Sequence, residues 1–324
     1  GCPAGRPSRM VGRPVAPALR LSTCGPAACL ALRAPGRLAS LLAASPACLL
    51  SWLAGLLADA GWPVALLEHP GSDAAAVQAL LDGRIPFDGS RALKQRLADL
   101  EAVVTAQADQ RLPVPGQEVV LMGHSLGALT ALLAAGAVPD AGTDRRCRRA
   151  LVELPLTNLS RLLQCELAEG RALGAVASTT APAAVVGLNS LGSLFWSKDG
   201  SRHLSMPLLL VGGTLDLITP PLDEQLALFS ALASHPSSRV VVVEGASHFS
   251  PIRVGESSAS GAGDDLFQLG EDLVGVNPLT VQAVIGAELI HFLETVSSER
   301  SGPEIDSRHL SNPEVRWHRL NRSL

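Results

Sequence analysis

Residues 118–136 read EVVLMGHSLGALTALLAAG, and this stretch decides the fold. The run 118–123 has the composition of a buried strand, and apolar residues resume at helical spacing after it. Between the two patterns, Gly123, Ser125 and Gly127 form a G-x-S-x-G motif. This context predicts a sharp strand–turn–helix element with the serine hydroxyl at its tip.

Further short apolar runs resemble the first one and lie at 63–67, 183–189, 207–213 and 239–245. They are continuous rather than alternating, which is typical of parallel strands covered by helices on both faces. Helical patterns fill the gaps at 91–106, 126–137, 222–233 and 279–297. The alternation predicts the α/β class, with a mostly parallel, doubly wound sheet.

Length and charge limit the function classes. The chain has 324 residues, of which 47% are hydrophobic, and a net charge of −4. A chain of this length suits one α/β domain with insertions, which we expect over residues 59–297. The body has no run of Lys and Arg, so the composition argues against a nucleic-acid partner.

The N-terminal arm, residues 1–58, differs from the rest. It contains six Arg and no acidic residue. Such a composition is typical of a targeting segment and also of out-of-frame GC-rich coding sequence, and both alternatives stay open. Residues 38–58 are uncharged and long enough to span a bilayer as a helix, although Pro46 disfavours membrane contact. An ordinary buried helix is the remaining alternative.

The cysteines and the site chemistry bear on cofactor and compartment. Four of the six cysteines lie in the arm without metal-ligand spacing, and Cys147 and Cys165 are isolated in the body. We therefore expect no metal site, no organic cofactor and a reduced, cytoplasmic compartment. Export or membrane anchoring through the arm is the alternative.

Two further segments are set apart by their patterns. Residues 144–175 are helical in pattern but lie between two strands, which predicts an inserted cap over the sheet. Residues 298–324 are polar, and we expect a frayed tail. The cap is rich in apolar residues that suit either an acyl chain or, as we expect, packing against the body: Leu151, Val152, Leu154, Leu156, Leu159, Leu162, Leu163 and Leu167.

A serine hydroxyl becomes a strong nucleophile only when a base removes its proton, and a carboxylate orients that base. Asp216 follows the strand at 207–213, and His248 follows the strand at 239–245. Both therefore leave from carboxyl ends of strands, the edge at which α/β sheets build their sites. The chain order Ser125, Asp216, His248 predicts a catalytic triad.

Other residues compete for these roles. Asp223 is a rival acid, and Asp216 is alternatively a helix cap. The rival bases are His203, His235 and His291. We expect His124, inside the elbow motif, to be a packing residue rather than the base. His69 follows a strand end and is a candidate for lining the site.

The body resembles the α/β-hydrolase superfamily, specifically the predicted dienelactone hydrolases of cyanobacteria that also resemble platelet-activating-factor acetylhydrolases. The matching pieces, which span about residues 57–295, are LLEHPGSD at 66–73, GHSLGALTAL at 123–132, LTNLSRLLQC at 156–165, AVVGLNSLGSLF at 184–195, GGTLDLITP at 212–220 and EGASHFS at 244–250. The resemblance implies that Ser125 is the nucleophile, Asp216 the orienting acid and His248 the base. It implies hydrolysis of esters or lactones without naming a substrate.

One part of the resemblance fails. The family has a strand ending in His-Gly before the segment LADAGW, and the loop after it supplies one N–H of the oxyanion hole. Here Leu41 and Leu42 stand near the expected positions. We therefore expect the first strands of the sheet to be missing or degraded. The backbone N–H of Leu126 is then the only oxyanion donor that we can assign.

The sequence thus predicts a serine hydrolase acting on a small-molecule carboxylic ester, thioester or lactone, with an apolar acyl part. Two alternatives remain open. One is an acyltransferase, although Ala128 stands where that motif has Glu. The other is a catalytically impaired relative that binds apolar ligands.

Overall fold

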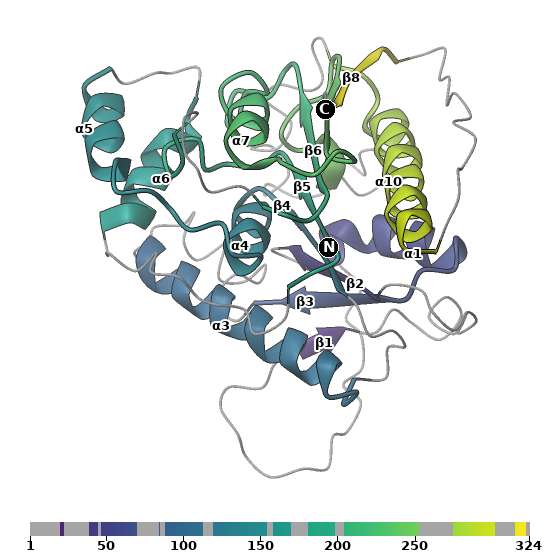
Figure 1. Ribbon diagram of the computed structural model, residues 1–324. Coiled ribbons are helices and arrows are strands. Elements are labelled where there is room, and N and C mark those ends of the chain that lie inside the picture. Colours follow the sequence, from purple (N-terminus) through teal and green to yellow (C-terminus); the bar gives the residue numbers. More distant parts are fainter. Residues whose placement is uncertain are drawn as a thin grey trace.

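The computed structural model describes residues 20–22, 39–44, 47–69, 84, 88–112, 119–153, 158–169, 181–197, 204–252, 275–301 and 315–321 (Figure 1). Within them the chain forms one eight-stranded sheet of order β1-β3-β2-β4-β5-β6-β7-β8. The strands are β1 (Arg20–Ser22), β2 (Ala39–Ala44), β3 (Val64–Glu68), β4 (Val119–His124), β5 (Ala184–Leu188), β6 (Leu208–Gly213), β7 (Arg239–Val243) and β8 (Trp317–Asn321).

The strands from β3 to β7 pair in parallel, and only β1 and β8 run antiparallel at the two edges. The central strands β5 and β6 are buried at every position. This explains their continuous apolar sequences, because both faces of each strand are covered. The predicted α/β class with a mostly parallel sheet is confirmed.

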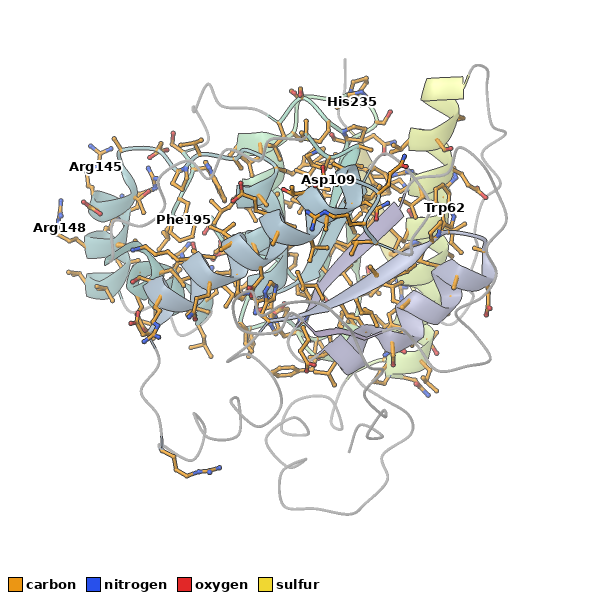
Figure 2. The ribbon with its side chains drawn as sticks, turned by 90° about the horizontal axis from the view of Figure 1, so that it is seen from below. Trp62, Asp109, Arg145, Arg148, Phe195 and His235 are labelled. Carbon is orange, nitrogen blue, oxygen red and sulfur yellow. The ribbon has the colours of Figure 1, made fainter. Side chains whose placement is uncertain are left out.

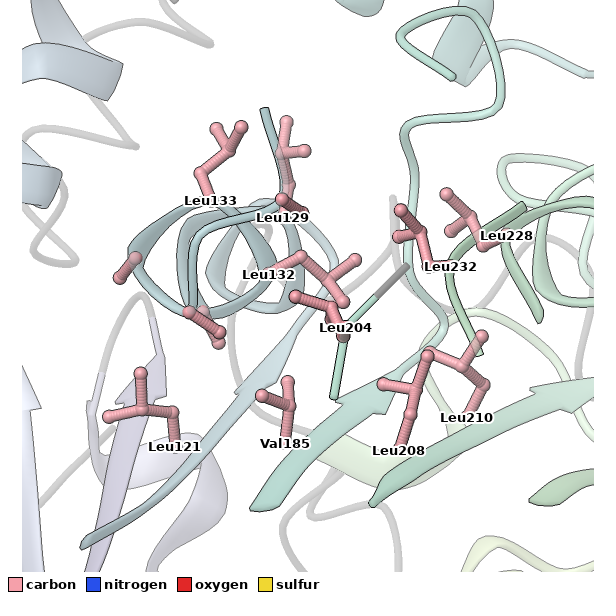
Figure 3. Close-up of a cluster of buried hydrophobic side chains, with 14 of the residues drawn as sticks. Leu121, Leu129, Leu132, Leu133, Val185, Leu204, Leu208, Leu210, Leu228 and Leu232 are labelled. Carbon is pink, nitrogen blue, oxygen red and sulfur yellow. The ribbon is translucent and has the colours of Figure 1, made fainter. Parts of the chain in front are cut away.

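Helices cover both faces of the sheet (Figure 1). One face carries α3 (Gly89–Ala108), α4 (Leu126–Ala134) and α7 (Gln225–Leu232), and the other carries α1 (Ser51–Asp59) and α10 (Pro278–Ser301). In Figure 3, Leu132 of α4 lies above Val185 of β5 and beside Leu204. This contact fixes the helix that follows Ser125 against the sheet, so the element carrying the serine rests on a packed core.

The expectation that the first strands are missing is wrong. Residues 20–22 form β1, and 39–44 form β2, which pairs in parallel with both β3 and β4. The segment 38–58 is therefore no single membrane-like helix. It comprises β2, a 3-10 turn at Ala47–Leu50 and α1, whose Leu53 and Leu57 are fully buried. Uncharged sequences are typical both of a strand followed by a packed helix and of a helix that spans a bilayer. Composition therefore could not distinguish these two structures.

Among the described residues, one helical segment, Pro278–Ser298, is long and apolar enough to cross a membrane. A buried core helix passes the same test, and 56% of an 18-residue window in this segment is buried inside the protein. Phe292 and Leu293 on it are fully buried against the sheet. Its apolar character is thus accounted for by packing.

The C-terminal segment 298–324 is not simply a frayed tail. Residues 317–321 form β8, which pairs antiparallel with β7. The sequence of β8 is polar because most of its side chains are exposed at the edge of the sheet. Charged side chains at such an edge also discourage pairing with another chain.

The predicted cap region contains α5 (Thr143–Glu153) and α6 (Ser160–Glu169), and α6 packs against α3. Arg145 and Arg148 of α5 project from one end of the molecule (Figure 2). The apolar residues of the cap divide into two sets. Leu163 and Leu167 pack into the body, whereas Leu151, Val152, Leu159 and Leu162 are exposed, so the packing expectation is wrong for those four. Residues 154 and 156 lie outside the described residues.

Candidate active site

The turn between β4 and α4 holds Ser125 in a strained conformation. Its φ of 52° and ψ of −118° are rare for a residue with a side chain. The turn is so tight that a Cβ on Gly123 would lie 2.2 Å from the backbone carbon of Gly127. Glycine at position 123 is therefore required sterically, as the motif predicts.

Three side chains from different elements meet at this turn. Ser125 Oγ lies 3.0 Å from His248 Nε2, and His248 Nδ1 lies 2.9 Å from Asp216 Oδ2. Asp216 and His248 are buried, at 1% and 5% exposure, whereas Ser125 is partly exposed. Ser125 is thus the most exposed of the three residues.

The hydrogen-bond directions follow from the carboxylate. Asp216 can only accept, so His248 carries its proton on Nδ1 and presents the lone pair of Nε2 to the serine hydroxyl. Burial by itself raises the pKa of Asp216, but the hydrogen bond and charge of His248, together with hydrogen bonds from Thr219, outweigh burial and hold it at about 2. The acid therefore stays ionised across the neutral range.

Two residues that the sequence did not single out hold the acid. Thr219 donates its backbone N–H to Asp216 Oδ1 at 2.7 Å and its hydroxyl to Oδ2 at 2.6 Å. Asn189, directly after β5, donates its amide to Oδ2 at 2.7 Å. Asn189 has a φ of 46°, a conformation that asparagine tolerates better than most residues. The polar residue directly after an apolar strand was the signal that could have identified it.

His124 lies beside the base. Its ring centroid is 4.9 Å from that of His248, and its Nε2 donates to the backbone carbonyl of His248 at 2.8 Å. Burial is the main cause that lowers the pKa of His124 to about 3, so the ring is neutral. His124 therefore does more than the packing that we expected, because it ties the loop of His248 to the turn that carries Ser125.

The expected oxyanion donor, Leu126, is the first residue of α4. Its N–H points out of the first helical turn, where no earlier carbonyl of the helix can accept it. Beneath this turn, buried Arg96 donates to the hydroxyl of Thr130, which in turn donates to the carbonyl of Leu126. A buried side chain of α3 therefore supports the first turn of the helix that follows Ser125.

The assignment of Leu41 and Leu42 to the end of the family's His-Gly strand is wrong. Both residues lie inside β2, which continues to Ala44. The positions directly after this strand, 45 and 46, lie outside the described residues. A second oxyanion donor is therefore not assigned.

The remaining candidates lie elsewhere. His69 is fully buried and contacts Asp99 of α3, with 3.1 Å between Nδ1 and Oδ2, so it does not join the triad. The rival acid Asp223 forms an ion pair with Arg161. The rival base His235 lies in the turn after α7, where its Nδ1 accepts from a backbone N–H (Figure 2), and His291 lies on α10. His203 is outside the described residues.

Among the described residues, no group of three or more His, Cys, Asp or Glu side chains could hold a metal ion. No protein-family model matches the chain, and no curated protein matches it. The geometry of Ser125, His248 and Asp216 is therefore what bears on function.

Proposed function

We propose that this protein is a serine hydrolase of the α/β-hydrolase superfamily that cleaves a carboxylic ester, thioester or lactone through an acyl-enzyme intermediate. The observation that carries the proposal is the hydrogen-bonded chain from Ser125 through His248 to Asp216, which begins at a strained strand–helix turn. The order Ser, Asp, His along the chain, after β4, β6 and β7, supports the superfamily assignment.

The proposed chemistry follows from these positions. His248 Nε2 removes the proton of Ser125, whose oxygen attacks the substrate carbonyl carbon, and the resulting oxyanion binds the N–H of Leu126. His248 then gives the proton to the leaving oxygen or sulfur, and the acyl group stays on Ser125. Water, deprotonated by the same imidazole, then attacks the acyl carbon, the bond from that carbon to Ser125 Oγ breaks, and His248 returns the proton to Ser125 as the acid leaves. Asp216 stabilises the imidazolium in both halves of the reaction.

An apolar acyl part suits the neighbourhood of the acid. Leu217, directly after Asp216, is 61% exposed, and its carbonyl accepts the N–H of Leu159, which is 45% exposed. These side chains supply apolar surface beside the loop that carries the acid.

The hydrolysis of p-nitrophenyl butyrate tests the proposal. We expect Ser125→Ala to lower kcat by about 10⁶-fold, because the nucleophile is removed. The matched control is Ser190→Ala, because the Ser190 hydroxyl is buried and makes no hydrogen bond within the described part of the chain. Wild-type turnover in Ser125→Ala would overturn the proposal.

A further inference from the structure

A second buried carboxylate, Glu224, lies next to the start of α7 and is fully buried. Its two oxygens have separate sets of donors. Oε1 accepts from Asn158 Nδ2 (2.8 Å), Gln164 Nε2 (2.9 Å) and Ser193 Oγ (2.7 Å), and Oε2 accepts from the backbone N–H groups of Gly192 (3.0 Å) and Ser193 (2.9 Å). The hydroxyl of Ser160 lies 3.2 Å from Oε1 and also donates to Asn158 Oδ1.

No Lys, Arg or His forms an ion pair with Glu224 in the described ranges of the chain. A buried carboxylate without a cation depends on its hydrogen bonds, because burial penalises any lone pair left without a donor. The donors come from two separate segments, the start of α6 within the cap, at 158–164, and the loop after β5, at 192–193. One carboxylate therefore joins the cap to the body.

The same start of α6 is hydrogen-bonded to the loop after β6 that carries Asp216. Leu159 N donates to the carbonyl of Leu217 at 3.2 Å, and Ser160 N donates to the carbonyl of Ile218 at 2.9 Å. The N–H of Ile218 in turn donates to Asp216 Oδ1 at 2.9 Å. The backbone at 217–218 is thus held by the cap on one side and holds Asp216 on the other.

We propose that Glu224 is a positioning residue. It fixes α6 of the cap against the loop that carries Asp216, and so keeps Asp216 aligned with His248. This inference rests on the proposed hydrolase function. The cap then has a role in the active site, because it stabilises the position of Asp216 through a buried carboxylate that does not contact the substrate.

Glu224→Gln is the direct test. In either orientation, the amide turns its NH₂ group toward one of the two sets of donors, so one set loses its acceptor. We expect kcat for p-nitrophenyl acetate to fall by about 10- to 100-fold, because small misplacements of catalytic groups have effects of this size. KM stays within about twofold, because Glu224 does not bind the substrate.

Glu288→Gln is the matched control. Glu288 is a buried carboxylate on α10 that pairs with Arg319 of β8, away from the triad. Both variants are expected to lower the temperature of unfolding, but only Glu224→Gln lowers kcat per active site titrated with a fluorophosphonate. Equal kcat values in the two variants would show that Glu224 is merely structural and overturn the inference.

A second pair of variants, with smaller changes, tests the inference if Glu224→Gln does not fold. Ser193→Ala removes one donor to Glu224, whereas Ser190→Ala removes an unbonded hydroxyl from the same loop. We expect a kcat about threefold lower or more in Ser193→Ala only. Equal values would overturn the inference while leaving the function standing. A wild-type protein without Ser125-dependent hydrolysis would reject the function itself, and the inference with it.

Discussion

Two His–Asp pairs lie near the carboxyl ends of strands, and only one of them is connected to a serine. His248 Nδ1 lies 2.9 Å from Asp216, and His69 Nδ1 lies 3.1 Å from Asp99. The other ring nitrogen, Nε2, contacts Ser125 Oγ in the first pair. In the second pair, Nε2 has no hydrogen-bond partner among the described residues. A His–Asp pair alone therefore does not indicate catalysis. The serine hydroxyl that contacts the imidazole is what distinguishes the first pair from the second.

The surroundings of the pairs differ as well. Burial is the main cause that lowers the pKa of His69 to about 4, although the hydrogen bond to Asp99 opposes this, and the nearby charge of Arg96 lowers it further. The ring is therefore neutral at pH 7. In the first pair, Thr219 and Asn189 add hydrogen bonds that orient the carboxylate of Asp216.

The largest contrast is expected from removing each imidazole. His248→Gln should lower kcat for p-nitrophenyl butyrate by about 10⁴- to 10⁶-fold, because no base then activates the serine. His69→Gln should change kcat by less than about threefold, since His69 does not contact the triad. Steady-state kinetics on both variants, with far-ultraviolet circular dichroism as the control for folding, measures the contrast. Equal losses would contradict the separation of the two pairs.

Removing each carboxylate charge should give the next largest contrast. Asp216→Asn is expected to lower kcat by about 10⁴-fold, because an amide no longer fixes the tautomer of His248 or stabilises the imidazolium. Asp99→Asn keeps an acceptor for the Nδ1–H of His69 and should leave kcat within about threefold. A similar loss in Asp99→Asn would show that the second pair also takes part in catalysis.

The smallest expected effect concerns stability in acid. The folded protein binds a proton at His69 more weakly than the unfolded chain does, so this stabilisation is complete above about pH 6.5 and is lost as the pH falls toward 4. The difference amounts to about 3 kcal/mol of unfolding free energy. Urea unfolding at pH 7, 5.5 and 4 should therefore show a weaker pH dependence in His69→Gln. If the unfolding free energy depends on pH equally in His69→Gln and in the wild type, His69 is already charged in the native state.

Much of the sheet and the triad could be predicted from the sequence. The runs that form β3 to β7 are apolar without interruption, because both of their faces are covered, and this pattern is visible in a single chain. Ser125 follows such a run directly, and Asp216 and His248 each lie within five residues of the end of one. Their proximity therefore follows from the rule that parallel strands end at a common edge.

The rest depends on pairings that local patterns do not encode. Strand β2 has an alanine-rich sequence with little preference for a strand, and it forms one through pairing with its neighbours β3 and β4. Glu224 could not be identified because its donors lie 31 to 66 positions away along the chain. Asn189 and Thr219 act through Asp216, so their roles can be recognised only from the folded conformation of the loop that carries Asp216.

The measurement that tests the central claim most directly is covalent labelling with a fluorophosphonate probe, read by peptide mass spectrometry. The probe phosphonylates a serine whose hydroxyl is activated by a neighbouring base. We predict one probe per chain, on Ser125, and no labelling of Ser125→Ala or His248→Gln. A folded wild-type protein that remains unlabelled, or that is labelled at another residue, would contradict the claim that Ser125, His248 and Asp216 form a working catalytic triad.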